Sequence, residues 1–150
     1  MRIKFLVGLT IQAALVVVGV LFSGGNLVVL FDFLSLLLVI GLSLAIAFGS
    51  WPAKDVIRAF GAPSDKDATK RELERSALFF HSLRSWIYAA SGLTVMIGII
   101  FSLKYINEWE PDHIGPNVAI SLLGIFYAFC LDTFIVLPLE SLARRRMLEM

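Results

Sequence analysis

The chain has 150 residues, of which 58% are hydrophobic and 17% are charged, and its mean hydropathy is +0.83. A soluble domain is nearer half apolar and a quarter charged, and at this size it leaves too much surface in water to hide so many apolar side chains. The composition therefore excludes an ordinary soluble domain and predicts a membrane protein. The net charge of +1 indicates no nucleic-acid partner, and a single cysteine, Cys130, excludes an internal disulfide.

Four runs without charged residues divide the chain. A helix rises about 1.5 Å per residue and the hydrocarbon layer is about 30 Å thick, so a span needs roughly 20 apolar residues. We therefore expect an all-α protein with transmembrane helices near 4–22, 32–50, 86–105 and 116–138, in a single membrane domain that covers 1–150. Arg2 and Lys4 before the first run are typical of a signal peptide. No small-residue cleavage site follows, however, and a second span comes at once, so we expect the first span to be retained.

Lysine and arginine predict the orientation. They precede the first span, lie between the second and third spans and follow the fourth, and only Lys104 falls on the opposite side. The positive-inside rule then places both termini and segment 51–85 in the cytoplasm. The outer turns are then 23–26 and 104–115, and the second of them is acidic.

Segment 51–85 is expected to contain two helices. The first follows Trp51-Pro52 and reaches Phe60, after which residues 61–64 predict a break. Ser64 is the expected N-cap of the second helix, which is charged and can continue without interruption into the third span. This charged helix is either a solvated spacer or a docking surface.

Small and polar residues form stripes on the last two spans. The third span carries Ser91, Thr94, Gly98 and Ser102 at i, i+3, i+7 and i+11, and the fourth carries Ser121, Ala128 and Asp132, with Ile125 between them. The antiparallel direction of the two spans predicts that Thr94 lies at the depth of Ala128 and Asp132. The stripes either line a central ion pathway or contact a partner helix, or they pack the two spans closely, as small residues do in membrane bundles.

Polar residues within the spans are candidate functional groups. Asp132 follows Pro116 by 16 residues, which is about 24 Å along a helix. A carboxylate inside a membrane often marks an ion route; the alternative is a carboxylate near the inner interface, or one that is kept neutral and hydrogen-bonded. Asp32, at the outer start of the second span, is expected to cap that helix. Gln12 is expected to form a hydrogen bond to another helix.

No pattern in the sequence is typical of an enzyme. A nucleotide-binding loop, zinc-ligand spacing and a catalytic triad are all missing. His81 and His113 lie in different segments. We therefore expect neither a metal site nor a bound cofactor, and no enzymatic activity.

Two stretches of the chain resemble one family of membrane proteins. The first has the turn Ser23-Gly24-Gly25-Asn26, the span that begins at Asp32, and the exit Trp51-Pro52-Ala53-Lys54; the second runs from Ile114-Gly115-Pro116-Asn117 through Leu122, Leu123 and Tyr127 to Leu137-Pro138-Leu139. Both resemble the MotA/TolQ/ExbB proton-channel family, most of all its flagellar-stator MotA branch, and the resemblance covers all four spans.

The resemblance implies a mechanism. Five copies of such a subunit surround two single-span partners of the MotB/TolR/ExbD kind in the bacterial inner membrane, and the partner supplies the ion-carrying carboxylate. A flow of protons or sodium ions then rotates the pentamer about the partner pair. The residues expected on the ion path or against the partner helix are Ser91, Thr94, Gly98, Ser102, Ser121, Gly124, Ile125, Ala128, Asp132 and Thr133. Structural roles are expected for Asp32, Pro52, Pro116, Tyr127 and Pro138.

The chain departs from the family pattern along the expected pore. Gly124 and Ile125 replace paired threonines, Ala128 replaces the glycine after Tyr127, and Asp132 replaces a small apolar residue. The cytoplasmic segment is also much shorter than in flagellar stators. We therefore expect a motor subunit that works on a non-flagellar or unknown load. The alternatives are a non-conducting scaffold that only holds a partner helix, or a four-helix membrane protein of another family.

Overall fold

The computed structural model describes residues 2–104 and 114–150, and the side chains of 7–103 and 118–150. The secondary structure of this part is helical throughout: α1 (Arg2–Phe22), η1 (Leu27–Leu30), α2 (Phe33–Ser50), α3 (Ala53–Gly61), η2 (Ala62–Ser64), α4 (Lys70–Lys104), α5 (Ile114–Leu131), the π-helix η4 (Asp132–Val136) and α6 (Leu137–Leu148). Most of the expected outer turn, with Glu108, Glu110, Asp112 and His113, lies outside the described residues.

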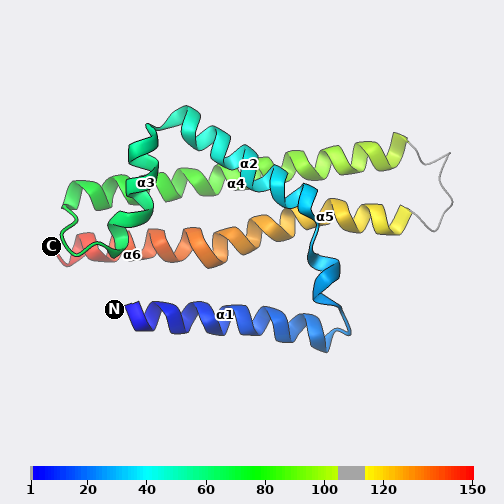
Figure 1. The fold of residues 1–150 in the computed structure, drawn as a ribbon, viewed down its shortest axis with the longest axis horizontal. Helices are drawn as coiled ribbons and strands as arrows, with labels where there is room; N and C mark the ends of the chain where they lie inside the picture. Colours follow the sequence, from blue (N-terminus) through cyan, green and yellow to red (C-terminus); the bar gives the residue numbers. More distant parts are fainter. Residues whose placement is uncertain (1, 105–113) are drawn as a thin grey trace.

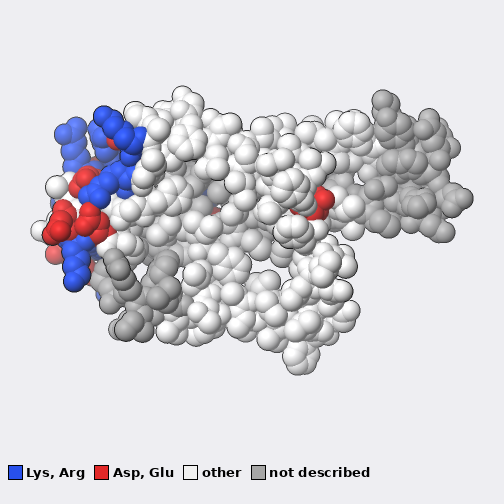
Figure 2. Space-filling view, in the orientation of Figure 1, with Lys and Arg blue, Asp and Glu red and all other residues white. Residues whose placement is uncertain are grey.

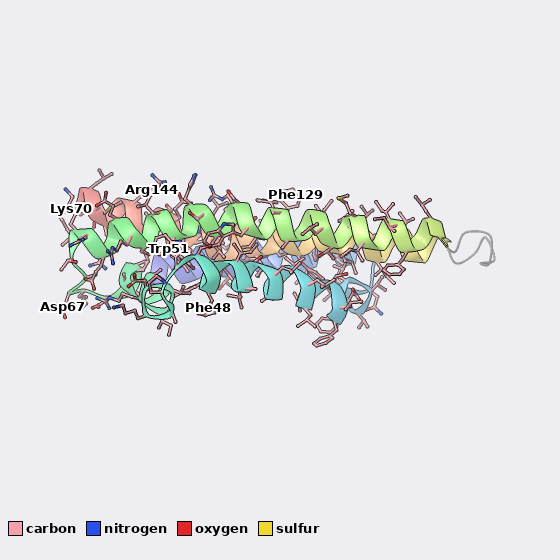
Figure 3. The ribbon with its side chains drawn as sticks, turned by 90° about the horizontal axis from the view of Figure 1, so that it is seen from above. Phe48, Trp51, Asp67, Lys70, Phe129 and Arg144 are labelled. Atoms are coloured by element: carbon pink, nitrogen blue, oxygen red, sulfur yellow. The ribbon has the colours of Figure 1, made fainter. Side chains whose placement is uncertain are left out.

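Two long antiparallel helices organise the molecule. One is α4, and the other is the continuous run of α5, η4 and α6 (Figure 1). Helix α2 crosses one face of this pair, α3 lies across its end, and α1 runs beside α5 and α6. Seen from above, α2 and α3 lie on the same side of α4 (Figure 3). Helix α1 begins, and α6 ends, at the same end of the molecule.

Three helices are long and apolar enough to cross a membrane. They are Leu27–Ser50, Lys70–Leu103 and Val118–Leu148, and a shorter apolar helix, Val7–Phe22, corresponds to the first predicted span. Lysines and arginines gather at one end of the molecule, and a wide band without them follows (Figure 2). Such a band is what the hydrocarbon core of a bilayer requires, which confirms the prediction of an all-helical, membrane-type fold.

Both ends of α2 follow from local chemistry. Asp32 caps its start, because Oδ2 accepts a hydrogen bond from Ser35 N at 2.8 Å. The helix stops before Pro52, since a residue that precedes proline avoids the helical region, and Trp51 is extended at φ −128° and ψ 145°. The carbonyl of Pro52 then accepts from Asp55 N at 2.8 Å, which starts α3.

Helix α4 starts later than the sequence predicts. The expected N-cap, Ser64, is wrong, because Ser64 ends η2 and Asp65 follows it in an extended conformation. The cap is Thr69, whose N and Oγ1 donate to Glu72 Oε2 at 2.8 and 2.9 Å, while Glu72 N donates back to Thr69 Oγ1 at 3.3 Å. This reciprocal pattern is a capping box. From Lys70 the helix runs for 35 residues without interruption, as expected.

The fourth predicted span continues well past Pro138. Leu137 N donates to Asp132 O, five residues earlier, which is the hydrogen bond of a π-turn. Proline has no N–H to donate and usually disturbs a helix. Here Pro138 follows the π-turn directly, and the chain stays helical to Leu148. Pro116 falls in the first turn of α5, and its side chain lies outside the described part.

An aromatic cluster joins α2 and α3 to α4. Phe79 and Phe80 are fully buried, and the Phe60 ring lies 5.7 and 5.2 Å from them, measured between centroids. Trp51 packs edge-on against Phe79 at 5.6 Å. Such ring pairs contribute about 0.5–1.5 kcal/mol each beyond the area that they bury. The cluster fixes the end of α2, and with it the position of α3.

Candidate functional site

Helices α4 and α5 pack closely through the small residues that the sequence singles out. A Cβ atom on Gly98 would overlap Ser121 Oγ and lie 2.9 Å from Ser121 Cβ. A Cβ atom on Gly124 would lie 3.2 Å from Thr94 Cγ2 and 3.5 Å from Ser91 O. The structure therefore brings five of the predicted site residues together: Ser91, Thr94, Gly98, Ser121 and Gly124. Close packing of α4 on α5 accounts for small residues at these positions.

The register of the two helices differs from the prediction. Thr94 lies opposite Gly124, whereas the side chains level with Asp132 are Arg84 and Tyr88. Thr94 and Tyr88 are six residues apart in α4, or about 9 Å along the axis. The expectation that Thr94 shares the depth of Asp132 is therefore wrong. The close approach at Gly98 sets this register, and the positions of the apolar runs alone do not define it.

A groove of about 290 Å³ opens between α2, α4 and α5. Its polar lining consists of Asp32, Ser35, Thr94, Ser102 and Ser121, and Gly98 and apolar side chains complete it. Thr94 Oγ1 donates to Ala90 O at 2.9 Å, and Ser102 Oγ donates to Gly98 O at 2.9 Å. These two hydroxyls thus satisfy carbonyls of their own helix while they line the groove.

Tyr127 fixes one edge of this groove. Its hydroxyl donates to Leu30 O at 2.8 Å and accepts from Asp32 N at 2.6 Å, so α5 holds the junction between η1 and α2. The side chain of Tyr127 is buried. Because Asp32 also caps α2, the two residues together position the start of that helix, which is a structural role for both.

Asp132 is a buried carboxylate in a cluster of charges that reaches the surface at Arg144, whose side chain is 57% exposed. Its Oδ1 accepts from Arg84 Nε at 2.9 Å, and its Oδ2 accepts from Tyr88 Oη at 3.0 Å. Arg84 Nη2 also binds Glu140 Oε2 at 3.0 Å, and Arg144 Nε binds Glu140 Oε1 at 2.9 Å. Asp132 and Glu140 are only 7% and 6% exposed. Two arginines and two carboxylates thus form a chain of ion pairs that joins α4 to η4 and α6.

This geometry agrees with one of the two interpretations of Asp132. Arg84 is the last charged residue before the uncharged part of α4, so Asp132 lies at the edge of the apolar band nearer the charged end. A buried ion pair is tolerated when its charges are matched and hydrogen-bonded, and removing one partner is costly. Asp132 is therefore a hydrogen-bonded, paired carboxylate at the charged-end edge of the apolar band, and both of its oxygens have partners.

Six of the ten predicted site residues do not line the groove: Ser91 and Gly124 lie in the contact between α4 and α5, Asp132 lies in the charge cluster, and the other three are Ile125, Ala128 and Thr133. Ala128 is fully buried between the helices, while Ile125 is 38% exposed and Thr133 is exposed. Thr133 lines a second, more open groove of about 420 Å³ between α1 and α6. Gln12 is exposed and lines the same groove, and its expected hydrogen bond to another helix stays a prediction. The structure thus places only Thr94, Gly98, Ser102 and Ser121 of the predicted set on one groove.

Sequence reasoning missed Arg84, Tyr88 and Glu140. Arg84 entered only as one of several basic residues in the cytoplasmic segment. Glu140 follows Asp132 by eight residues, close to two helical turns, so the two carboxylates share a face. Two acidic residues on one face, opposite a basic residue that borders an apolar run, are the signal that could have predicted this cluster.

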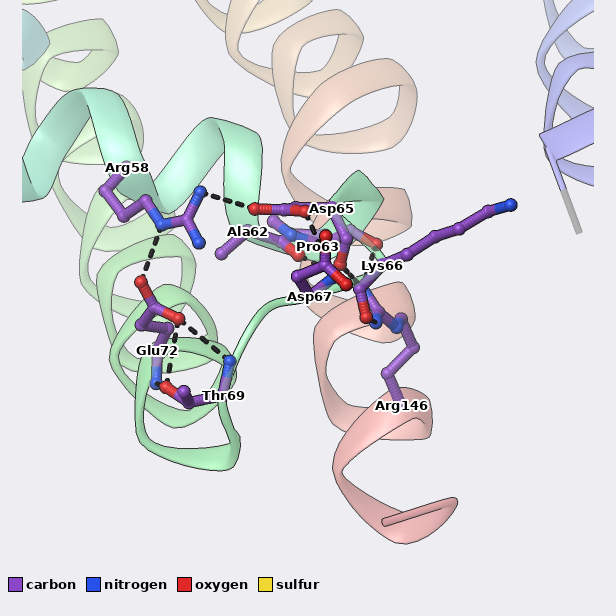
Figure 4. Close-up of polar contacts among 9 residues, drawn as sticks. All are labelled: Arg58, Ala62, Pro63, Asp65, Lys66, Asp67, Thr69, Glu72 and Arg146. Atoms are coloured by element: carbon purple, nitrogen blue, oxygen red, sulfur yellow. Dashed lines mark hydrogen bonds and ion pairs between the residues drawn. The ribbon is translucent and has the colours of Figure 1, made fainter.

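Two arginines tie together the charged end of the molecule (Figure 4). Arg58 Nη1 binds Asp65 Oδ2 at 2.7 Å, and Arg58 Nε binds Glu72 Oε1 at 2.8 Å. The Arg58 guanidinium lowers the pKa of Glu72 to about 2 and holds the pKa of Asp65 below its usual value. Arg146 of α6 donates to the carbonyl oxygens of Ala62, Pro63, Asp65 and Lys66. Helices α3, α4 and α6 are therefore joined around one turn.

Comparison with known proteins adds no relative. No model of a protein family matches this chain, and no curated protein matches it. Among residues with described side chains, no group of three or more His, Cys, Asp or Glu gathers as a metal site. The function therefore has to follow from the residues and geometry of the chain itself.

Proposed function

We propose that the chain is the ring-forming subunit of an ion-driven membrane motor. In this proposal four transmembrane helices place both termini in the cytoplasm, and five copies surround two single-span partners of the MotB/TolR/ExbD kind in a bacterial inner membrane. The observation that carries the proposal is that α4 and α5 form a tightly packed wall with a polar groove, while Arg84 and Tyr88 already bind Asp132.

The ion pair between Asp132 and Arg84 supports the proposal that the ion-carrying carboxylate belongs to another chain. An ion-carrying carboxylate has to bind and release its ion repeatedly. To do so, Asp132 would have to leave Arg84, and breaking a buried ion pair costs about 3–5 kcal/mol. A carboxylate on a partner helix has no such restraint, and the hydroxyls of Thr94, Ser102 and Ser121 give it a polar wall.

The distribution of charge supports the proposed topology. Helix α1 has 21 residues, which is about 30 Å and matches the hydrocarbon thickness. None of its described side chains is buried, and residues such as Ile11 and Leu15 are more than half exposed, as expected of a helix surrounded by lipid. The basic residues lie at the end where α1 begins and α6 ends, which by the positive-inside rule is the cytoplasmic end.

Apolar surface remains on α4 and α5 for neighbouring copies and lipid. Met96 and Ile100 on α4 are 59% and 58% exposed, and Phe129 on α5 is 56% exposed. A ring needs such a surface on both sides of each subunit. The charged end, in the part that the structure describes, consists mainly of α3, η2, the start of α4 and α6, which favours a load other than a flagellar rotor.

The test uses the complex purified from its native membrane through a tag at the carboxyl terminus. Native mass spectrometry should give five copies of this chain and two of a single-span partner, and vesicles that contain the complex should take up protons or sodium ions. Thr94→Val should reduce the uptake, Thr94→Ser should preserve it, and Thr133→Val is the matched control outside the groove. Four or six copies would instead favour a membrane protein of another family.

A non-conducting scaffold is the second candidate. The observation that favours it is that Thr94 and Ser102 donate their hydroxyl protons to their own helix, while Gly124 and Ile125 carry no hydroxyl. The same preparation separates the two functions. A complex with the expected copy numbers and no ion uptake, in either a proton or a sodium gradient, would identify a scaffold that only holds the partner helix.

A further inference from the structure

Helix α3 has two chemically different sides that point in opposite directions along α4. On one side Arg58 binds Glu72, near the start of α4. On the other side Phe60 packs against Phe79 and Phe80, in the direction of the apolar band. Glu72 and Phe80 are eight residues apart, about 12 Å along the axis. Because α3 lies across the end of the bundle (Figure 1), its aromatic side faces the band and its charged side faces away from it.

The side that faces the apolar band is only partly covered. Val56 and Ala59 are buried against the bundle, at 3% and 5% exposure. Ala53, Ile57 and Phe60, at i, i+4 and i+7, form a neighbouring edge of the helix. Ile57 is 70% exposed and Phe60 is 39% exposed. The apolar surface of α3 thus extends beyond the part that packs on the protein.

We propose that α3 lies in the plane of the membrane interface and that its edge of Ala53, Ile57 and Phe60 enters anionic phospholipid. Short helices with one apolar and one charged face bind in this way, with the apolar face at the boundary between headgroups and acyl chains. Trp51, directly before α3, is a residue type that membrane interfaces favour. The inference rests on membrane embedding of α2, α4 and α5, and it is independent of ion conduction.

Charge supports anionic lipid as the occupant. Arg58 is engaged by Asp65 and Glu72, but Lys54 is exposed and has no ion pair within the described part of the chain. Lys54 lies one position from Ala53, between the apolar edge and the charged side of the helix. An ammonium group in this place reaches the phosphates of headgroups while its methylene stem covers apolar surface.

Single-cysteine variants test the position of α3 in the full-length protein. In a Cys130→Ser background, Ile57→Cys, Met96→Cys and Asp67→Cys are labelled with an environment-sensitive fluorophore and reconstituted in phosphatidylcholine vesicles with phosphatidylglycerol. The Ile57 label should be quenched by a spin-labelled lipid and shielded from aqueous iodide. Met96, in the apolar band, is the lipid reference, and Asp67 is the water reference.

The Met96 and Asp67 labels distinguish a wrong position of α3 from a wrong assumption of membrane embedding. If the Ile57 label is as open to iodide as the Asp67 label while the Met96 label remains shielded, the interfacial position of α3 is refuted and membrane embedding stands. If the Met96 label is also open to iodide, membrane embedding itself is wrong. Phosphatidylglycerol should also raise the melting temperature of the unlabelled Cys130→Ser protein. The added substitution Lys54→Gln should remove most of this rise. Lys66→Gln is the matched control, and an equal shift in Lys54→Gln would overturn the role of Lys54.

Discussion

Replacing Arg84 with methionine removes the cation that two buried carboxylates share. Asp132 keeps only the Tyr88 hydroxyl at 3.0 Å, whereas Glu140 keeps Arg144 at 2.9 Å. The loss therefore falls mainly on Asp132, which is 7% exposed. An unpaired buried charge costs about 3–5 kcal/mol, and we expect a loss near 3 kcal/mol in the free energy of unfolding, because one hydrogen bond remains.

The double variant makes this prediction specific to the pair. Asp132→Leu alone leaves Arg84 with Glu140, and should cost about 1–2 kcal/mol for the lost charged hydrogen bonds. Arg84→Met combined with Asp132→Leu removes both charges and fills the space with apolar atoms. Replacing a buried ion pair in this way is often neutral, so the double variant should unfold within about 1 kcal/mol of the unmodified protein.

The assay is denaturant unfolding of the detergent-solubilised protein, followed by tryptophan fluorescence. The coupling between the two substitutions should therefore be at least about 3 kcal/mol, which is the top of the range for residues in direct contact. A loss below about 0.5 kcal/mol for Arg84→Met would refute the buried ion pair, because that is the effect of an ordinary surface substitution. Strict additivity of the two single variants would refute it as well.

Three further outcomes follow from the geometry. Gly98→Ala should destabilise the protein by about 1–3 kcal/mol through overlap with Ser121, while Gly92→Ala, whose Cβ would meet nothing within 4 Å, should be neutral or stabilising; the reverse order in thermal unfolding would contradict the packing of α4 on α5. Tyr127→Phe should cost about 1–3 kcal/mol, since it leaves two backbone groups without their partner; an unchanged unfolding midpoint would exclude this anchor. The pKa of Glu72 is about 2 in the folded protein and 4.5 without its partners, so its contribution is complete above pH 4.5 and is lost as the pH falls towards 2. The protection of amides at the start of α4, measured as the exchange rate relative to the intrinsic rate at each pH, should therefore fall over that window in the unmodified protein and not in Glu72→Gln, and equal behaviour of the two would contradict the ion pair with Arg58.

The ends of elements were predictable where one residue decides them. Asp32 caps α2 with its side-chain oxygen, and Pro52 ends the helix because it keeps Trp51 out of the helical conformation. Both effects are local, so the sequence alone predicts them. The start of α4 was missed, since Ser64 and Thr69 are both good caps. Only Thr69 is followed three residues later by a glutamate, and the reciprocal hydrogen bonds with Glu72 decide between them.

The relative placement of the helices was not predictable from the chain. The stripe on α4 shows which face is small, but two smooth helices can slide along each other, and the contact of Gly98 with Ser121 selects one register. The partner of Asp132 depends on that register and lies 48 residues away in the sequence. The continuation past Pro138 was missed for another reason, because the π-turn before it is a tertiary accommodation that no local pattern indicates.

Ion uptake by vesicles containing the native complex tests the central claim most directly. The account places the ion-carrying carboxylate on the partner, so uptake should require the partner's intramembrane aspartate. A complex that carries Asp132→Asn, in which the amide oxygen still accepts from Arg84, should retain most of the uptake. Uptake by this chain alone that Asp132→Asn abolishes would contradict the account, because the carrier would then be Asp132 itself.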